Sequence, residues 1–328
     1  MAEIPLISVV IPVKNEALLL EHCLESLRSL AYPADRLEVI VADAQSRDNT
    51  REIAERNGAR VVENEKQIVV SGRNRGFEHA RGELVAFTDA DCLFDAQWLA
   101  NSLKYFEDEK VAGVGGPTLM PQDSTHFEQA VNLLFELAGM IGVTSHRQAF
   151  AEAYETFDIP GCNAIYRRKA LQEVMPVDEG LLTAEDVWMN EQLRARGYKF
   201  IMAPDVIVWH YRRSAPFTFM RQIYRFAIGR FQAGKRKARL LKPLHVAAAL
   251  TIPLLLALEF ALRFIAAMWL YPILVMLFVF DCFFLAFLHT RKLMPSIYFP
   301  FVVFIFCCFW SLGAMREMLF PLRDPAGR

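Results

Sequence analysis

The chain has 328 residues, enough for one large domain or two modest ones. Its hydrophobic fraction of 54% and mean hydropathy of +0.20 are high for a soluble protein of this size. The formal net charge of −1 excludes a generic polyanion binder, because no global positive field exists to hold nucleic acid. Six cysteines without C-x-x-C spacing fit a reducing compartment.

Segments typical of strands and helices alternate before Leu244. The first run, 6–13, has no basic leader, so we expect a strand rather than a signal peptide. The alternation predicts a parallel sheet covered by helices on both faces. For the helix expected at 127–142 two positions stay open: it packs in the core, or it lies against a membrane. Strands are expected at 6–13, 37–42, 60–62, 84–88, 111–115 and 200–209, and helices at 18–30, 51–57, 74–80, 98–106, 127–142 and 184–196.

Polar residues follow three of the predicted strands directly. They are Asn15 with Glu16, then Asp43, and then Asp89. Ligands of such sheets bind beyond the carboxyl ends of the strands. We therefore expect these side chains to face one crevice.

Asp89-Ala90-Asp91 is the sharpest chemical feature of the sequence. Two carboxylates one residue apart after a buried strand can bind a divalent cation and a neighbouring sugar hydroxyl. Mg²⁺ or Mn²⁺ often takes only one or two protein carboxylates and fills its other sites with phosphate and water. The alternative is a solvated loop that caps the helix near Ala96.

Three motifs in order resemble glycosyltransferase family 2, whose members have the GT-A fold, a Rossmann-like α/β domain that binds nucleotide sugars. V-V-I-P-V-K-N-E matches its opening strand, and Asp43, Ser46, Asp48 and Thr50 match a D-x-x-S-x-D-x-T signature. The run from Ser71 to Asp91 matches the segment leading into its metal motif. The resemblance covers residues 6 to about 230, with Ala44 in place of an acidic residue and Gln45 in place of a glycine.

The resemblance implies a role for particular residues of this chain. Asp91 and His210 would bind Mg²⁺ or Mn²⁺, although a lone histidine is as often structural. Residues implied to contact the nucleotide sugar are Pro12, Asn15, Glu16, Asp43, Arg73, Asn74 and Asp89.

Glu185-Asp186 resembles the family's catalytic pair, with Asp186 as the base, which implies inversion at the anomeric carbon. The other interpretation is an acidic pair that stabilises a helix N-terminus. Gly161 and Asn163 match a G-x-N motif near the acceptor. Gln222 and Arg225 resemble a Q-x-x-R-W motif that clamps the diphosphate, with Phe226 in place of Trp; an interfacial arginine is the alternative.

The remainder of the chain predicts attachment to a membrane. A basic amphipathic region, 216–243, precedes a nearly continuous apolar segment, 244–328. The segment suits a hairpin turning near Glu259 to Arg263, with both flanks on the cytoplasmic side, followed by a third crossing. The domains expected are a GT-A domain, 1–215, the interfacial region and the membrane region, with spans near 244–263, 265–288 and 296–316.

Together these features predict an inverting glycosyltransferase. It would move a sugar from a nucleoside diphosphate donor, with uridine diphosphate favoured, to a lipid-linked acceptor. We expect a multi-pass protein of the inner (plasma) membrane with a cytoplasmic catalytic domain and no nucleic acid partner. Polyprenyl phosphate as the acceptor is a close variant. A non-catalytic sensor of nucleotide sugars is a more distant alternative.

Overall fold

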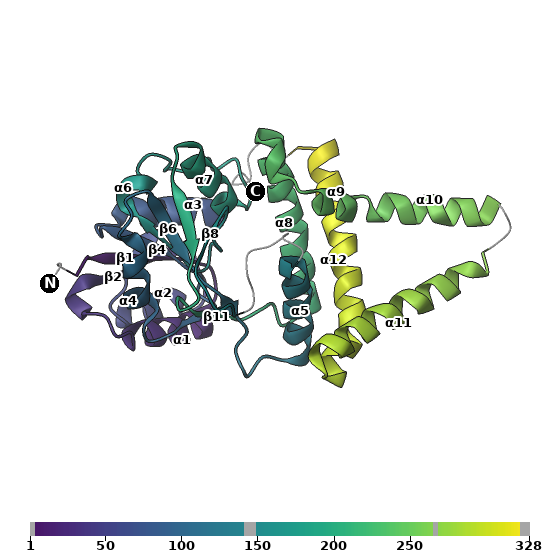
Figure 1. The fold of residues 1–328 in the computed structure, drawn as a ribbon, viewed down its shortest axis with the longest axis horizontal. Helices are drawn as coiled ribbons and strands as arrows, with labels where there is room; N and C mark the ends of the chain where they lie inside the picture. Colours follow the sequence, from purple (N-terminus) through teal and green to yellow (C-terminus); the bar gives the residue numbers. More distant parts are fainter. Residues whose placement is uncertain (1–3, 141–148, 265–267, 322–328) are drawn as a thin grey trace. The chain divides into compact units, whose positions relative to one another are not determined.

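The computed structural model describes residues 4–140, 149–264 and 268–321. The chain divides into two compact units (Figure 1). The described residues of the first unit are 4–121 and 149–211, and those of the second are 122–140, 212–264 and 268–321. Gly142, the expected end of one helix, and 265–267, the expected start of a membrane span, lie outside the described residues.

The first unit is built on an eight-stranded sheet in the order β3-β2-β1-β4-β9-β6-β10-β8. β3, β2, β1 and β4 are parallel, as expected, and so are β6 and β10. β9 runs antiparallel to both of its neighbours, and β8 is antiparallel to β10, so the sheet is mixed and the expectation of a purely parallel sheet was wrong. The strands are β1 (Ile7–Val13), β2 (Leu37–Asp43), β3 (Arg60–Glu63), β4 (Leu84–Phe87), β6 (Val111–Gly115), β8 (Tyr154–Thr156), β9 (Ala164–Arg167) and β10 (Lys199–Met202).

The centre of the sheet is buried on both faces. All seven residues of β1 are buried, which explains its unbroken apolar run. Its neighbour α3 begins five residues before the expected start at 74 and packs against β1 and β2. The helices of this unit are α1 (Ala17–Arg28), α2 (Thr50–Arg56), α3 (Val69–His79), α4 (Trp98–Leu103), α6 (Arg168–Leu171) and α7 (Glu185–Ala195), with 3-10 turns η1 (Ala34–Arg36) and η2 (Lys104–Phe106).

A second, three-stranded sheet brings distant segments together in the order β5 (Cys92–Phe94), β11 (Val208–His210) and β7 (Thr118–Leu119). The strand expected at 200–209 is therefore two strands in different sheets, β10 and β11, separated around Pro204. β11 is antiparallel to β5, with His210 opposite Cys92. This pairing places His210 beside the residue that follows Asp91.

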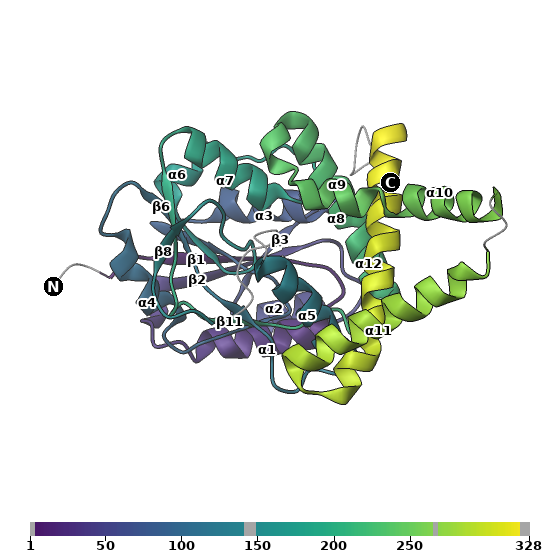
Figure 2. The same cartoon turned by 45° about the vertical axis from the view of Figure 1, so that its right-hand side comes forward.

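The second unit is helical. α5 (His126–Met140), α8 (Pro216–Arg236) and α12 (Leu293–Leu319) pack around a shared apolar core and lie side by side in both views (Figures 1 and 2). α5 is thus grouped with the C-terminal helices. The remaining elements are η3 (Ala238–Leu240), α9 (Pro243–Ala249), α10 (Thr251–Phe264) and α11 (Leu270–Thr290).

Two of the described helices, α11 and α12, are long and apolar enough to cross a membrane. α9 and α10 pass the same test only as a pair bent by 47°. The turn expected at Glu259 to Arg263 is absent, because α10 continues through both residues, whose side chains pair at 2.6 Å one helical turn apart. Only 6% of the most apolar stretch of α11 is buried, against 44% for α12, so α11 presents its apolar surface outward.

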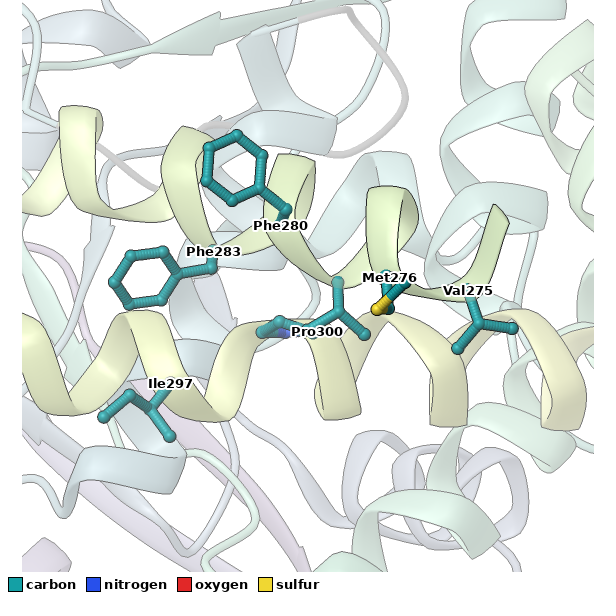
Figure 3. A pocket seen from close by; sticks show the side chains of 7 residues that line it. Val275, Met276, Phe280, Phe283, Ile297 and Pro300 are labelled. Atoms are coloured by element: carbon teal, nitrogen blue, oxygen red, sulfur yellow. The ribbon is translucent and has the colours of Figure 1, made fainter. Parts of the chain in front are cut away.

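An apolar groove of about 440 Å³ lies between α11 and α12 (Figure 3). Pro300 interrupts the hydrogen bonding of α12 beside it. The groove is lined by Val275, Met276, Val279, Phe280, Phe283, Ile297 and Pro300.

Close packing of α3 on β1 depends on Gly76. A Cβ added there would lie 2.1 Å from Cγ1 of Val10, a stiff β-branched side chain of the central strand. Gly76→Ala is expected to destabilise the full chain by about 1–3 kcal/mol, the cost of overpacking a filled core. Glu78→Ala, on the exposed side of the same helix, should stay within about 0.5 kcal/mol. Thermal unfolding in detergent measures both, and equal effects would contradict the packing argument.

Candidate active site

The loops after β1 and β2 are tied together by side chains of the D-x-x-S-x-D-x-T motif. This motif therefore has a structural function: it fixes the backbone that leaves the carboxyl end of β1. Three N–H groups of the first loop donate to the second: that of Asn15 to Ser46 Oγ (2.8 Å), that of Glu16 to Thr50 Oγ1 (3.1 Å) and that of Ala17 to Asp48 Oδ2 (3.2 Å).

A polar cleft of about 340 Å³ lies beside these loops. Asn15, Gln45 and Gln67 border it with φ angles of +52°, +57° and +56°. Non-glycine residues adopt this left-handed conformation at a cost, and such strain concentrates at functional sites. Lys14 and Arg47, also in the lining, supply positive charge suited to a phosphorylated ligand.

Two other residues implied to contact the nucleotide are buried at the same ends of the strands. Asp43 is the last residue of β2, is 4% exposed, and accepts the N–H of Ser46 at 3.2 Å. Pro12 lies within β1, where α3 approaches so closely that a Cβ on Gly72 would be 2.8 Å from the Cβ of Pro12.

Asp89, Asp91 and His210 converge on one point of the first unit. Their ligand atoms all lie within 4.8 Å of one another, and His210 Nε2 is 3.0 Å from Asp91 Oδ1. Asp91 is 4% exposed, so its carboxylate is largely withdrawn from water. Two carboxylates and an imidazole are a donor set that fits Mg²⁺ or Mn²⁺.

Arg73 links these carboxylates to the acidic pair of α7. Its guanidinium is 2.7 Å from Glu185 Oε1 and 3.3 Å from Asp89 Oδ1, and it donates to the carbonyl of Gly161 at 2.9 Å. The N–H of Gly161 donates to Asp186 Oδ2 at 3.2 Å. A Cβ on Gly161 would lie 2.8 Å from both Arg73 Nη1 and Asp186 Oδ2, so any larger residue would displace one of these two charged groups.

Burial dominates the electrostatics of this network. It raises the pKa of Asp89 to about 6 and that of Glu185 to about 7, against the opposing effect of the Arg73 charge. Burial also acts to lower the pKa of Arg73, but Glu185 and Asp89 outweigh it and hold that pKa above its ordinary value. Arg73 therefore stays charged between two carboxyl groups that bind protons unusually tightly.

Two of the three asparagines of the predicted site, Asn74 and Asn163, are held by hydrogen bonds to other segments of the protein. Asn74 donates to the carbonyl of Val177 and accepts its N–H, both at 2.8 Å. Asn163 accepts from Trp98 Nε1 and donates to the carbonyl of Val206, also both at 2.8 Å. These contacts indicate that the asparagines fix loops; contact with donor or acceptor stays a prediction.

Gln222 and Arg225 lie on α8 in the second unit. Both are partly exposed. Their role toward a diphosphate stays a prediction.

Several residues of the cleft were missed by the sequence analysis. Gln45 carried a signal: it stands where the related family has glycine, and its φ of +57° is the conformation that favours glycine. Lys14 lies in the first motif, whereas Arg47 and Gln67 carried no comparable signal. The sequence pattern assigned no function to Cys92 and Cys162, which approach His210.

A mixed α/β sheet with two carboxylates and a histidine gathered beyond its strand ends is the arrangement expected of a GT-A glycosyltransferase. The model of the family "Glycosyl transferase family 2" matches residues 8–175, more than half of the chain, which therefore belongs to this glycosyltransferase family.

Similar proteins agree with this assignment. Glycosyltransferase AglE of Haloferax volcanii is 30% identical over 238 residues, covering 70% of this chain and 74% of its own. A Methanococcus voltae protein is 24% identical over 229 residues, covering 66% and 70%; it is a dolichyl N-acetyl-alpha-D-glucosaminyl phosphate 3-beta-D-2,3-diacetamido-2,3-dideoxy-beta-D-glucuronosyltransferase. The mannosyltransferase PcManGT of Pyrobaculum calidifontis, solved with GDP-Man and Mn²⁺, shares the fold, with a TM-score of 0.64 at 22% identity over 97% of this chain and 88% of that one.

The raised pKa of Glu185 predicts a pH-dependent stability. Between its ordinary value of 4.5 and about 7, the folded chain holds a proton that the unfolded chain releases. The contribution of this carboxyl is therefore complete below pH 4.5 and is lost as pH rises through 7. With a chelator present, the melting temperature of the wild type should fall more steeply between pH 4.5 and about 7 than that of Glu185→Gln, whose side chain cannot ionise. Parallel slopes would contradict the shift.

Proposed function

We propose that this glycosyltransferase inverts the anomeric centre of a sugar that it moves from a nucleoside diphosphate donor to a lipid-linked acceptor at a membrane. The observation that carries the proposal is the convergence of Asp89, Asp91 and His210 in the unit that also holds Asp186. Arg73 and Gly161 join the two groups through direct contacts.

Asp186 is our candidate base. It is the second residue of α7, two positions after Ala184, which has a φ of +66°, and it is partly exposed. The N–H groups of Gly161 and Val187 donate to its two oxygens at 3.2 and 2.8 Å and so fix its orientation. A carboxylate held in this way can accept the proton of an attacking hydroxyl, and a single displacement inverts the anomeric carbon.

Asp89, Asp91 and His210 would hold a divalent cation, Mg²⁺ or Mn²⁺. When bound, it supplies positive charge that stabilises the departing diphosphate. The residues fit such an ion because three donor atoms of suitable chemistry already lie within 4.8 Å of one another.

The nucleotide would occupy the cleft beside β1 and β2. Lys14 and Arg47 supply charge there, and Asp43 ends the neighbouring strand, where it would accept a hydrogen bond from the base. We favour a uridine diphosphate sugar as the donor. GDP-Man in PcManGT belongs to that protein, so a panel of nucleotides is the appropriate test.

The acceptor is proposed to be attached to a lipid. α11 and α12 suit a membrane, and the Methanococcus voltae relative is named for a dolichyl-linked sugar phosphate. We further propose that the protein is a multi-pass component of the inner membrane with its active site on the cytoplasmic side, since basic residues flank the apolar helices at 235–242 and 291–292. Polyprenyl phosphate itself is the second candidate acceptor.

Replacement of the two key aspartates tests the proposal. Asp91→Asn should abolish divalent-dependent release of nucleoside diphosphate, and Asp186→Asn should slow sugar transfer by roughly 100-fold or more, as for loss of a general base. Asp35→Asn, whose side chain is 83% exposed, is the matched control. The assay is mass analysis of a lipid extract incubated with the protein and a panel of nucleotide sugars. Unchanged turnover in Asp91→Asn would refute the cation's role.

A further inference from the structure

His210 contacts a second set of metal-ligating atoms besides the carboxylates. The ligand atoms of Cys92, Cys162 and His210 all lie within 4.8 Å of one another. Cys162 Sγ is 3.7 Å from His210 Nδ1, whereas the other ring nitrogen, Nε2, is 3.0 Å from Asp91 Oδ1. One imidazole therefore lies between two sulfurs and a carboxylate cluster.

The spacing of this second set suits a tetrahedral ion. Zinc binds sulfur at about 2.3 Å and nitrogen at about 2.0 Å, which places two such ligands about 3.5 Å apart around the metal. The observed 3.7 Å between Cys162 Sγ and His210 Nδ1 is close to that separation. The three residues lie on different segments: Cys92 begins β5, Cys162 precedes β9 and His210 ends β11.

The chemistry of the two sets differs in kind. Sulfur and imidazole select thiophilic ions such as Zn²⁺, whereas carboxylates select Mg²⁺ and Mn²⁺. The cysteines are buried, with 0% and 7% exposure, whereas the side chain of His210 is 14% exposed. His210 is thus the ligand that an entering ion can reach first.

We propose that Cys92, Cys162 and His210 form a second cation site, for Zn²⁺ or a similar thiophilic ion, that inhibits the enzyme by withdrawing His210 from Asp89 and Asp91. A neutral imidazole has one nitrogen that carries a proton and one that offers a lone pair. An ion on Nδ1 leaves the proton on Nε2, which then donates to Asp91 and cannot bind a metal. Binding to the sulfurs is independent of the proposed function; only the inhibition rests on it.

Binding is tested with Cd²⁺, whose thiolate complexes absorb in the ultraviolet, on the full chain in detergent with a non-thiol reductant. We expect the absorption to saturate at one Cd²⁺ per chain. Cys162→Ser and Cys92→Ser should each weaken binding by roughly 100-fold or more, because loss of a ligand costs at least as much as loss of its supporting contacts. Cys282→Ser, on α11, is the control and should bind as the wild type does.

Thermal unfolding shows that each serine variant is folded. If Cys92→Ser fails to fold, Cys162→Ser alone decides. Absorption that persists in folded Cys162→Ser, or that never appears in the wild type, overturns the site.

The shared histidine is tested with the electron paramagnetic resonance signal of free Mn²⁺. Added Zn²⁺ should release bound Mn²⁺ at roughly 10-fold or more lower concentration in the wild type than in Cys162→Ser. Equal release would mean that Zn²⁺ displaces Mn²⁺ at the carboxylates directly, which overturns the inhibition. Asp91→Asn separates the two proposals. If this variant keeps the Cd²⁺ absorption and loses turnover, both proposals are supported. Turnover that is retained in the variant refutes only the proposed function. Absorption that is lost in the variant refutes only the cysteine site.

Discussion

The arrangement of the candidate active site depends on one buried cation, the guanidinium of Arg73. A charge that is 5% exposed is tolerable only when it is paired, and Arg73 is paired with Asp89 from the end of β4 and with Glu185 from the start of α7. The same group donates a hydrogen bond to the carbonyl of Gly161, whose N–H donates to the carboxylate of Asp186. Arg73 therefore positions the metal-ligating carboxylates and the candidate base relative to one another. The close packing of α3 on β1 fixes the backbone that carries Arg73.

The parallel half of the sheet could be predicted because its cause is local. β1 is buried on both faces and so shows an unbroken apolar run, and α1, which follows it, shows a regular apolar period. The small sheet could not be predicted in this way. β7 and β11 have two and three residues, too few for a period, and their pairing is set by long-range packing. The direction of β9 is likewise a property of its neighbours β4 and β6.

Site residues that belong to a sequence motif could be predicted, whereas contacts between residues far apart in the chain could not. Asp43 ends β2, and Asp89 and Asp91 follow β4, so their place at the sheet edge follows from topology. The contacts of Asn74 with Val177, and of Asn163 with Trp98, join residues far apart in the sequence, and no local pattern indicates them. The membrane region shows the same limit: Glu259 and Arg263 suggested a turn as isolated charges, but as an i,i+4 pair they are compatible with a continuous helix.

His210 shows how one backbone pairing couples two kinds of chemistry. Asp91 and Cys92 are consecutive, and β11 sets His210 opposite Cys92, with the N–H of Tyr211 donating to the carbonyl of Asp91 at 3.0 Å. In this register the imidazole of His210 contacts the carboxylate of Asp91 through Nε2 and approaches Cys162 Sγ through Nδ1. An asparagine or aspartate at this position would supply an oxygen to the carboxylate cluster but nothing for the sulfurs. The imidazole is therefore what brings a hard and a soft donor set within reach of a single residue.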